Sequence, residues 1–342
     1  MSERLEDIAI AMVAEGQGIL AADESTGTIK KRFDSINVES TEDKRRDYRE
    51  MLFRSDEAMK NHISGVILFE ETLGQKAADG TPLVDLIRAA GAVPGIKVDK
   101  GAQDLTNAGV EKVTEGLDGL RGRLAGYYEQ GARFAKWRAV ITITETTPSW
   151  NCIKANAHAL ARYAALCQEA GIVPIVEPEV LMDGEHSKHD INRCYEVTEW
   201  ALKTQFNELF DAGVNLEGMV LKPNMIVPGQ SSGSKASVEE VAEKTVKCLK
   251  ASVPALVPGI AFLSGGQSDE DATAHLAAMN AAYDMPLEPD ILLWPCSTSR
   301  SIASLAWQGM KMYRPAQAAF SHRAKMNGMA ALGTWTKAHE AG

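Results

Sequence analysis

Short apolar runs alternate with longer segments of helical periodicity along this chain, and this alternation limits the possible folds more than any other feature. Eight such runs begin, in chain order, near Gly18, Gly65, Pro94, Phe134, Ile172, Leu216, Gly259 and Ile291. Their mean spacing is about 39 residues, which accommodates a strand, a crossover helix and two loops. Eight consecutive βα units favour a closed barrel over an open sheet, so we predict an α/β protein with a (β/α)8 TIM barrel.

Several helices have clear sequence signals. The N-terminal segment carries apolar residues at helical spacing and then a glycine, Gly16, that can end the helix; the apolar residues are Leu5, Ile8, Ala9, Met12 and Val13. Ser237 with Glu240, and Ser268 with Asp271, form capping-box patterns ahead of two later helices. We therefore expect an N-terminal helix before the barrel and a C-terminal helical extension after it.

The length of 342 residues allows one domain or two, since domains average about 150 residues but α/β barrels of this size are single domains. Residues 228–236, PGQSSGSKA, could be an interdomain linker. The segment is short, however, and it lies between the sixth strand and its helix, where a barrel has an active-site loop. We predict a single barrel domain spanning residues 1–342.

The composition limits the partners and the compartment. The chain has 36 basic and 46 acidic residues and a net charge of -10, which argues against nucleic acid as a partner. Five cysteines without a CxxC pair suit a reducing cytosol, and the charged N-terminal residues do not resemble a secretory signal. No apolar run reaches the roughly 18 residues of a membrane span. We expect a cytoplasmic protein that binds neither nucleic acid nor membrane.

Charged residues, polar residues and glycines stand at the C-terminal ends of the predicted strands, where buried parallel strands are normally apolar. In chain order they are Asp23, Lys97, Lys136, Arg138, Glu177, Glu179, Lys222, Ser264, Gly265, Gly266, Ser297 and Arg300. Ion pairs that only fill the end of the barrel would explain any single charge. Because buried unpaired charges cost several kcal/mol, so many of them at equivalent positions favour a catalytic cluster at the barrel mouth.

The cluster contains the groups needed to cleave a carbon–carbon bond next to a ketone. A lysine attacks a carbonyl only when its amine is neutral, and burial or a neighbouring cation lowers its pKa to that end. Lys222 and Lys136 provide such a pair of lysines, and Asp23, Glu177 and Glu179 provide carboxylates for proton transfer. The sequence thus predicts Schiff-base chemistry on a lysine.

A phosphate site is predicted separately, after the seventh and eighth strands, where TIM barrels often bind phosphate. Ser264, Gly265 and Gly266 offer unobstructed backbone amides, and Arg300 adds a guanidinium. Residues 269–271 are all acidic at the start of the next helix, so we assign the phosphate to the loop amides and not to the helix dipole.

Three other motifs have simpler interpretations. His186 and His189 could be half of a zinc site, but no third histidine stands at a strand end, so an exposed loop is preferred and no metal is predicted. Residues 41–50, TEDKRRDYRE, are interpreted as a solvated helix face. Met310 and Met312 are interpreted as packing residues near the end of the chain.

Seven motifs together resemble class I fructose-1,6-bisphosphate aldolases: AADESTGTIKKRF, PGIKVDKG, GLDGL, FAKWRAVI, PIVEPEVLMDG, LKPNM and FLSGGQS. The resemblance runs from residue 16 to residue 267 and continues more loosely through AQAAFSHRAKMN. It implies a metal-independent enzyme of glycolysis and gluconeogenesis, with a sugar-phosphate substrate and a homotetrameric assembly.

The resemblance also implies a role for each matching residue. Lys222, in LKPNM, matches the lysine that forms the Schiff base with the substrate ketone, and no cofactor takes part. Glu177, in VEPE, matches the acid/base group that assists carbinolamine dehydration, with Glu179 beside it. Asp23 matches the carboxylate near the C4 hydroxyl, and Lys136 the cation that keeps the site poised for reaction.

The remaining matches concern the two phosphates. One group matches positions at the second phosphate or the nearby rim: Lys97, Arg138, Ser25, Thr28, Lys31 and Arg32. The other matches positions at the first phosphate: Ser264, Gly265, Gly266, Ser297 and Arg300.

The chain departs from the family pattern in two places. Residues 296–302 read CSTSRSI where the family usually has FSYGRAL, and the last tyrosine is Tyr313, whereas many members carry one at the end of a C-terminal tail. Two alternatives therefore stay open: a Schiff-base aldolase with another sugar-phosphate specificity, and a barrel that has lost catalysis and serves as a binding scaffold. The binding-scaffold alternative is disfavoured because the chain retains all of the matching catalytic residues, Lys222, Lys136, Glu177 and Asp23.

Overall fold

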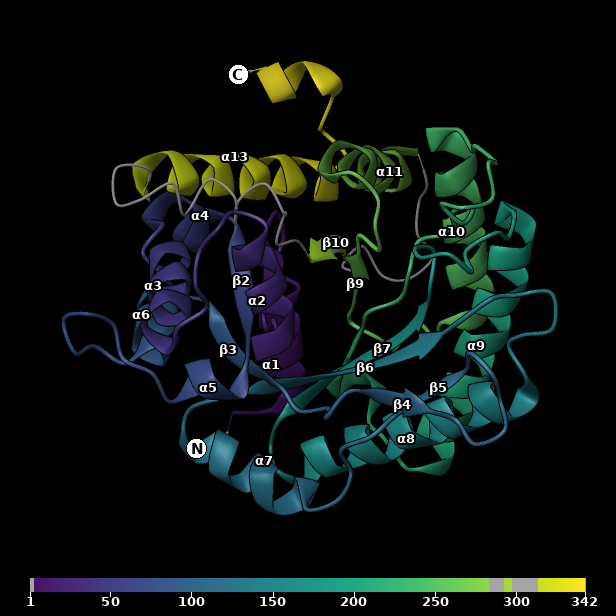
Figure 1. Cartoon of the computed structure of the whole chain (residues 1–342), viewed down its shortest axis with the longest axis horizontal. Coiled ribbons are helices and arrows are strands. Elements are labelled where there is room, and N and C mark those ends of the chain that lie inside the picture. Colours follow the sequence, from purple (N-terminus) through teal and green to yellow (C-terminus); the bar gives the residue numbers. More distant parts are fainter. Residues whose placement is uncertain (1–2, 283–291, 297–312, 342) are drawn as a thin grey trace.

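The structure is a computed structural model and describes residues 3–282, 292–296 and 313–341. Its main sheet has eight parallel strands in the order β1-β2-β3-β6-β7-β8-β9-β10, and the first strand contacts the last (Figure 1). The strands are β1 Gly18–Ala22, β2 Ile63–Leu68, β3 Val93–Lys97, β6 Phe134–Ile141, β7 Val173–Val180, β8 Val220–Leu221, β9 Gly259–Leu263 and β10 Leu292–Cys296. The fold is the predicted (β/α)8 barrel.

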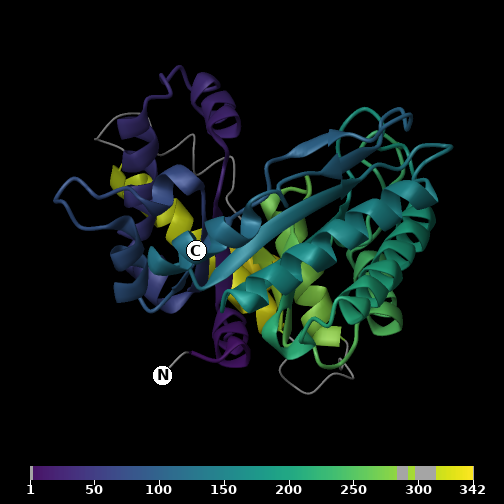
Figure 2. The ribbon, with the colours of Figure 1, turned by 90° about the horizontal axis from the view of Figure 1, so that it is seen from below.

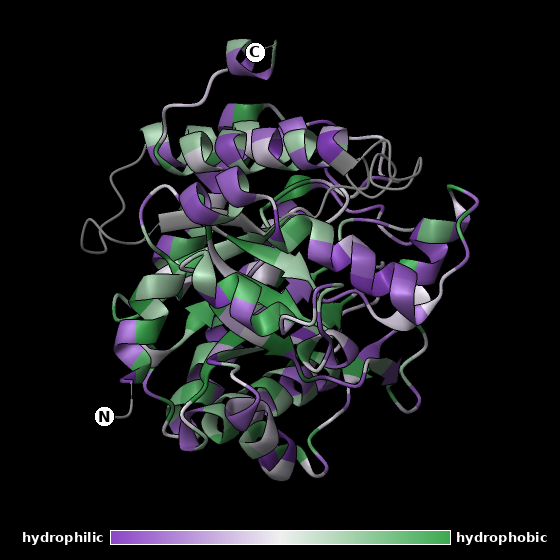
Figure 3. Cartoon of the chain, turned by 90° about the vertical axis from the view of Figure 1, so that its left-hand side faces the viewer, coloured by the Kyte–Doolittle hydropathy of each residue, from purple (hydrophilic) through white to green (hydrophobic). Residues whose placement is uncertain are grey.

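Helices surround the strands in both views of the ribbon (Figures 1 and 2). They are α1 Leu5–Met12, α2 Thr26–Asp34, α3 Glu42–Phe53, α4 Asp56–Asn61, α5 Glu70–Leu73, α6 Leu83–Ala89, α7 Leu120–Glu129, α8 Trp150–Glu169, α9 Ile191–Asp211, α10 Val238–Ser252, α11 Asp269–Ala282 and α13 Tyr313–Ala331, with 3-10 turns η1 Leu216–Gly218 and η3 Lys337–Ala341. Hydrophobic residues concentrate in the strands and hydrophilic residues on the outer helices (Figure 3). No helix in the described ranges is long and apolar enough to cross a membrane.

Each of the eight predicted runs overlaps a strand, but the sixth strand begins later than expected. Residues from Leu216 form the 3-10 turn η1, because the Asn215 side chain accepts a hydrogen bond from the Glu217 amide at 3.1 Å and turns the chain. The strand itself is only Val220–Leu221. Pro223 follows two residues later and has no N–H to extend the ladder. This short strand still presents Lys222 at its C-terminal end.

A second, small sheet was not predicted from the sequence. Strands β4 (Ala102–Asp104) and β5 (Lys112–Thr114) form an antiparallel hairpin between β3 and α7. The Thr114 hydroxyl donates to the carbonyl of Arg138 at 2.8 Å, so the hairpin lies against the C-terminal half of β6 (Figure 1). It covers a part of β6 next to the barrel mouth.

The predicted helix starts are confirmed. The Ser237 hydroxyl accepts from the Glu240 amide at 3.2 Å at the start of α10, and Ser268 accepts from the Asp271 amide at 3.0 Å at the start of α11. Residues 228–236, predicted as an active-site loop, connect β8 to α10.

Helix α1 closes the N-terminal end of the barrel. It contacts η1, β2, β3 and β7, and the Ser64 hydroxyl donates to the carbonyl of Met12 at 2.6 Å. A Cβ atom on Gly259 would lie 2.4 Å from Val13, so only a glycine lets this end of α1 approach β9 so closely. Gly16 then adopts a φ of 69°, which permits the turn into β1.

The interpretation of residues 41–50 as a solvated helix face was wrong. These residues form most of α3, and three of their charged side chains are buried: Arg45, Arg49 and Glu50. Arg49 has no exposed surface. Burial is possible because acidic partners from distant parts of the chain, Glu24 and Glu71, meet this face of the helix.

Candidate active site

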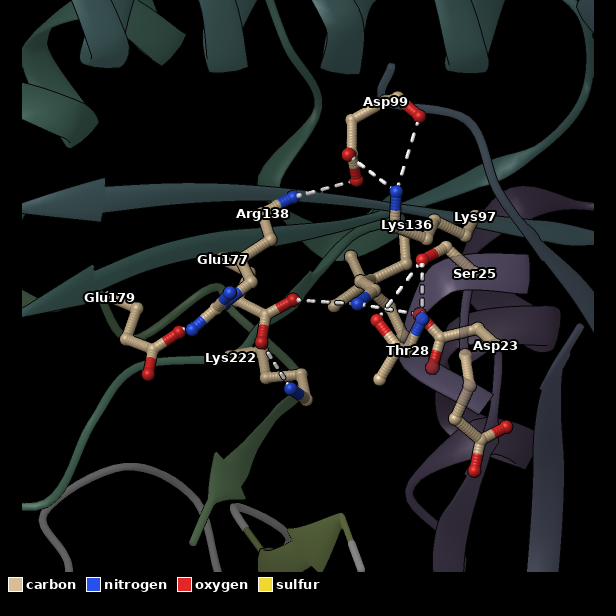
Figure 4. A network of polar contacts seen from close by, with 12 residues as sticks. Asp23, Ser25, Thr28, Lys97, Asp99, Lys136, Arg138, Glu177, Glu179 and Lys222 are labelled. Atoms are coloured by element: carbon tan, nitrogen blue, oxygen red, sulfur yellow. Dashed lines mark hydrogen bonds and ion pairs between the residues drawn. The ribbon is translucent and has the colours of Figure 1, made fainter. Parts of the chain in front are cut away.

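The strand-end residues predicted from the sequence converge on one cavity of about 590 Å³ at the C-terminal mouth of the barrel. Its lining includes Asp23, Ser25, Thr28, Arg32, Lys97, Lys136, Arg138, Glu177, Glu179, Lys222, Ser264 and Gly265. The residues labelled in Figure 4 come from strands and loops that are far apart in the sequence. The C-terminal ends of parallel strands meet at one rim, which explains why the cluster could be anticipated.

The centre of the cavity is a row of alternating charges. The Lys222 ammonium donates to Oε1 of Glu177, whose Oε2 lies 3.3 Å from Nζ of Lys136. Nζ of Lys136 is in turn 2.7 Å from Oδ2 of Asp23 (Figure 4). Lys136, Glu177 and Lys222 are buried, with 6%, 2% and 5% of their surface exposed. Each charge is therefore balanced by a neighbour and not by water.

These neighbours decide the protonation of the central groups. Burial alone would raise the pKa values of Asp23 and Glu177, but the attraction of Lys136 and Lys222 outweighs burial and lowers both. Burial would likewise lower the pKa of Lys136, but Asp23 and Glu177 outweigh it and raise that pKa above its usual range. At neutral pH the site holds two carboxylates and a permanent cation on Lys136.

A second set of ion pairs lies nearer the rim. The Arg138 guanidinium pairs with Glu179, and the Lys97 ammonium with Oδ1 of Asp99 at 2.5 Å. The other oxygen of Asp99 accepts from the Arg138 amide at 3.4 Å, so one carboxylate joins the ends of β3 and β6. Arg138 keeps 43% of its side chain exposed and can reach a bound anion.

The predicted phosphate loop follows β9 directly. Gly265 and Gly266 have φ values of 55° and 90°, which glycine adopts without strain. A Cβ on Gly265 would lie 2.5 Å from the Met182 side chain, which would have to move to make room for it. The Gln230 side chain donates to the Gly266 carbonyl, which ties the loop after β8 to the phosphate loop. Gly266 itself is not among the residues that line the cavity.

Helix α2 brings a further group of predicted residues to the cavity. Ser25 caps the helix by accepting from the Thr28 amide at 3.3 Å, and its hydroxyl is 3.0 Å from that of Thr28. Arg32, two turns into the helix, lines the cavity and pairs with Glu24. Lys31 is exposed and is not part of the lining, so the structure does not bring it together with the others.

Four predicted residues, Ser297, Arg300, Met310 and Met312, lie outside the residues that the structure describes. Most of the divergent segment 296–302 lies there as well. The part of the first phosphate site predicted after the eighth strand therefore stays a prediction.

The exposed-loop interpretation of the two histidines holds for one of them only. His186 is exposed, but His189 is buried, with 7% of its surface accessible, and neither ring nitrogen has a partner in the described residues. Burial lowers the pKa of His189, so its ring is neutral at pH 7. Among the residues described, no three His, Cys, Asp or Glu side chains come together as a metal site.

Sequence reasoning missed four charged residues at or behind the site: Glu24, Arg49, Glu71 and Asp99. Asp99 stands two residues beyond Lys97 in PGIKVDKG, and a period of two along the strand end could have identified it. Glu24, Arg49 and Glu71 come from separate segments, and no local pattern relates them.

A buried lysine bonded to a carboxylate, with a second lysine and a second carboxylate beside it, can exchange protons within the row and attack a carbonyl. Glycine amides and cationic side chains at the rim can hold phosphates. The molecule therefore belongs to the class of (β/α)8 barrels that carry a buried lysine, hydrogen-bonded to a carboxylate, at the C-terminal mouth.

The comparisons with known proteins agree with this class. A model of the glycolytic class I fructose-bisphosphate aldolase family matches residues 4–342. The chain is 54% identical to a probable class 1 fructose-bisphosphate aldolase of Xanthomonas campestris, over 97% of this chain and 98% of the relative. It is 52% identical to a cytosolic fructose-bisphosphate aldolase of Arabidopsis thaliana, over 93% of this chain and 80% of the relative.

A solved structure of fructose-bisphosphate aldolase from Plasmodium falciparum, in complex with TRAP and a small-molecule inhibitor, superposes with a TM-score of 0.91. It is 43% identical, and the match covers 97% of this chain and 95% of that one. The chain belongs to the class I fructose-bisphosphate aldolase family, whose members are lyases of glycolysis.

Proposed function

We propose that this enzyme cleaves fructose 1,6-bisphosphate reversibly through a Schiff base on Lys222. The observation that carries the proposal is the buried row Lys222–Glu177–Lys136–Asp23, in which the amine is already bonded to a carboxylate that can take its proton. Because Lys136 stays protonated beside it, the cation helps to hold the developing charges of the reaction.

The reaction begins when Lys222 gives a proton to Glu177 and its neutral amine attacks the C2 ketone. Glu177 then protonates the carbinolamine hydroxyl, which leaves as water, and a positively charged iminium remains. Asp23 removes the proton of the C4 hydroxyl and the C3–C4 bond breaks. Its electron pair moves into the iminium to give an enamine, and glyceraldehyde 3-phosphate leaves.

Protonation of the enamine at C3 and addition of water at C2 then release dihydroxyacetone phosphate and restore Lys222. We propose that water or Glu177 supplies the C3 proton. A tyrosine near the C-terminus is not the donor we propose, because residues 337–341 of this chain contain none. These residues pack against α13 through the ion pair between Glu340 and Arg323, at 2.7 Å.

We propose that the two phosphates bind in separate parts of the cavity. We assign one to the loop Ser264–Gly265–Gly266 with Ser297 and Arg300, and the other to Lys97, Arg138, Ser25, Thr28 and Arg32, which line the cavity; Lys31 is left out because it does not. Two groups of cations, hydroxyls and glycine amides favour a doubly phosphorylated sugar. Comparing turnover of fructose 1-phosphate with that of the bisphosphate tests this, because an aldolase for another sugar phosphate would prefer its own substrate.

We further propose that the enzyme uses neither metal nor cofactor, that it acts in the cytoplasm and that it assembles as a homotetramer of single-domain chains. The iminium supplies the electron withdrawal that a metal would otherwise provide. Full activity in a strong chelator is expected, and loss of activity would revive the metal site at His186 and His189. Sedimentation of the purified protein tests the assembly.

Borohydride reduction in the presence of dihydroxyacetone phosphate, followed by peptide mapping, tests the mechanism. We expect one reduced adduct, on Lys222. The matched control is Lys222→Arg, which keeps the positive charge but cannot form a Schiff base. An adduct on another lysine, or none, contradicts the mechanism, and absence of turnover would favour the binding-scaffold alternative.

A further inference from the structure

The Arg49 guanidinium lies behind the barrel mouth, and nothing in the reaction described above uses it. It projects from α3 toward the loops that follow β1 and β2 and has no exposed surface. It does not line the cavity. A buried guanidinium needs charged partners to repay its desolvation, so its surroundings indicate what it does.

Arg49 joins two separate loops. Its Nη2 donates to the backbone carbonyl of Glu24 at 2.8 Å and lies 3.8 Å from Oε2 of the same residue. Its Nη1 lies 3.6 Å from Oε2 of Glu71, at the start of α5. A planar guanidinium has five donors in a rigid fork, which suits it to bridge two loops at fixed angles.

The first of these loops carries the proposed base for C–C cleavage. Glu24 directly follows Asp23, so the bond from Arg49 to the Glu24 carbonyl acts one residue away from the Asp23 side chain. The Glu24 carboxylate also pairs with Arg32, which lines the cavity. Arg49 thus contacts, through one residue, both a proposed catalytic carboxylate and a proposed phosphate ligand.

The bonds of Arg49 are not optimal for stability alone. Its Nε and Nη1 have no hydrogen-bond partner in the described residues, and Oε2 of Glu24 has none either. Buried polar atoms without a hydrogen-bond partner lower the stability of the folded state. An apolar side chain of similar volume often stabilises the fold equally well. A positioning role in catalysis gives a reason for placing a full charge here.

We propose that Arg49 is a positioning residue that holds Asp23 at the C4 hydroxyl during cleavage. The proposal rests on the role assigned to Asp23 under the proposed function. Displacing a reacting group by about 1 Å can slow a reaction roughly 100-fold, so a loosened loop after β1 lowers the rate even when Asp23 is intact. Schiff-base formation is assigned to Lys222, which follows β8, and to Glu177 on β7; neither lies on this loop, so we expect that step to be retained.

Arg49→Lys tests the proposal, because lysine keeps the charge but cannot bridge both loops. We expect kcat for fructose bisphosphate cleavage to fall about 10- to 100-fold. The KM and the yield of the borohydride-trapped dihydroxyacetone phosphate adduct on Lys222 stay close to those of the wild type. Arg45→Lys is the matched control: Arg45 lies on the same helix and pairs with Glu71, but it does not contact Glu24. Its cleavage and trapping are both expected to stay near wild type.

Three results would overturn the proposal. If the kcat of Arg49→Lys lies within about twofold of the wild-type value, Arg49 does not position Asp23. If cleavage and adduct trapping fall equally, the substitution has damaged the fold in general. Equal losses in Arg45→Lys and Arg49→Lys assign the effect to α3 as a whole. If Arg49→Lys does not fold, Glu71→Gln decides: we expect a several-fold loss of cleavage with normal trapping, and wild-type cleavage overturns the proposal.

The proposed function is tested separately by the wild type and Asp23→Asn. A wild type that cleaves but yields no adduct on Lys222, or an Asp23→Asn enzyme that cleaves normally, contradicts the proposed mechanism. If the wild type yields the adduct on Lys222 and Asp23→Asn loses cleavage as expected, but Arg49→Lys cleaves at the wild-type rate, only the role of Arg49 is contradicted.

Discussion

The two ends of the barrel are held together by different physics. At the N-terminal end the contacts are apolar and close: Phe134 packs against Gly65 and Gly95, and Val13 against Gly259. At the C-terminal mouth the contacts are ionic, with two buried lysines, the buried Glu177 carboxylate and the half-buried Asp23 in one row. Close packing rewards a good fit of volumes, whereas buried charges repay their desolvation only when every partner is present.

This difference separates stability from chemistry. Changes at the apolar end are expected to alter the free energy of unfolding but not the turnover of the folded enzyme. Changes at the mouth are expected to alter both, because the same ion pairs that neutralise the buried charges also move protons in the reaction.

The largest effect is expected from Lys136→Met. The substitution leaves Asp23 without its ion-pair partner and Glu177 with Lys222 as its remaining direct partner, so we expect a loss of about 3–5 kcal/mol in the free energy of unfolding. We expect kcat to fall about 10²- to 10⁴-fold. Urea unfolding and a coupled assay measure the two effects. Lys203→Met, at a surface pair with Glu199, is the control and should change stability by less than about 1 kcal/mol. More than a tenth of wild-type activity at unchanged stability would contradict the cation's role.

The apolar end is tested by Gly95→Ala. The added Cβ would lie 2.2 Å from the Phe134 ring, so the core is overpacked and we expect a loss of about 1–3 kcal/mol. The kcat per folded molecule should stay at the wild-type value. Gly122→Ala, where the added atom meets nothing within 4 Å inside α7, is the control and should stabilise by about 0.5–1 kcal/mol. A large fall in kcat for Gly95→Ala would show that the two ends are coupled.

Acid should weaken the ion pairs of the mouth. The pKa values of Asp23 and Glu177 are lowered in the folded protein, below the usual 3.8 and 4.5. Their contribution to stability is therefore complete above the unfolded-state pKa values and is lost as the pH falls through the folded-state ones. Asp23→Asn should lose less free energy of unfolding than the wild type when the pH is lowered from 7 to 3. Equal losses would mean that Asp23 is not responsible for this acid sensitivity.

The smallest effect is expected away from both ends. Ser237→Ala removes the cap of α10, whose hydroxyl accepts from the Glu240 amide, and should cost about 1 kcal/mol. Turnover should not change. Ser237→Asp, which keeps a cap acceptor, should retain wild-type stability. If the alanine variant also loses activity, the periphery contributes to the site more than the described contacts indicate.

Local patterns predicted much of the fold and of the site. The apolar runs report on the burial of consecutive residues, and the capping boxes on hydrogen bonds made within one helical turn, so strands such as β1 and β7 and the start of α10 were found from the sequence. Strand-end charges such as Lys136 and Glu177 were found for a related reason: a barrel brings equivalent strand positions to one rim.

Predictions failed where burial depended on a partner from elsewhere in the chain. The charged face of α3 looked solvated because neither Glu24 nor Glu71 is near it in sequence. The burial of His189 was missed for the same reason. The β4–β5 hairpin was missed for another one: its two strands are neighbours in the chain, but each has only three residues, too few to show a strand periodicity.

The number of βα units, the residues at their ends and therefore the chemistry available at the mouth could be read from the amino-acid sequence, because these depend on short-range periodicity and on residue type. How those charges pair depends on the folded chain. The row from Lys222 to Asp23 and the bridge from Arg49 to two loops both depend on distances of a few ångströms between segments far apart in the chain. Electrostatic energies inside a protein vary steeply over such distances, and no sequence pattern records them.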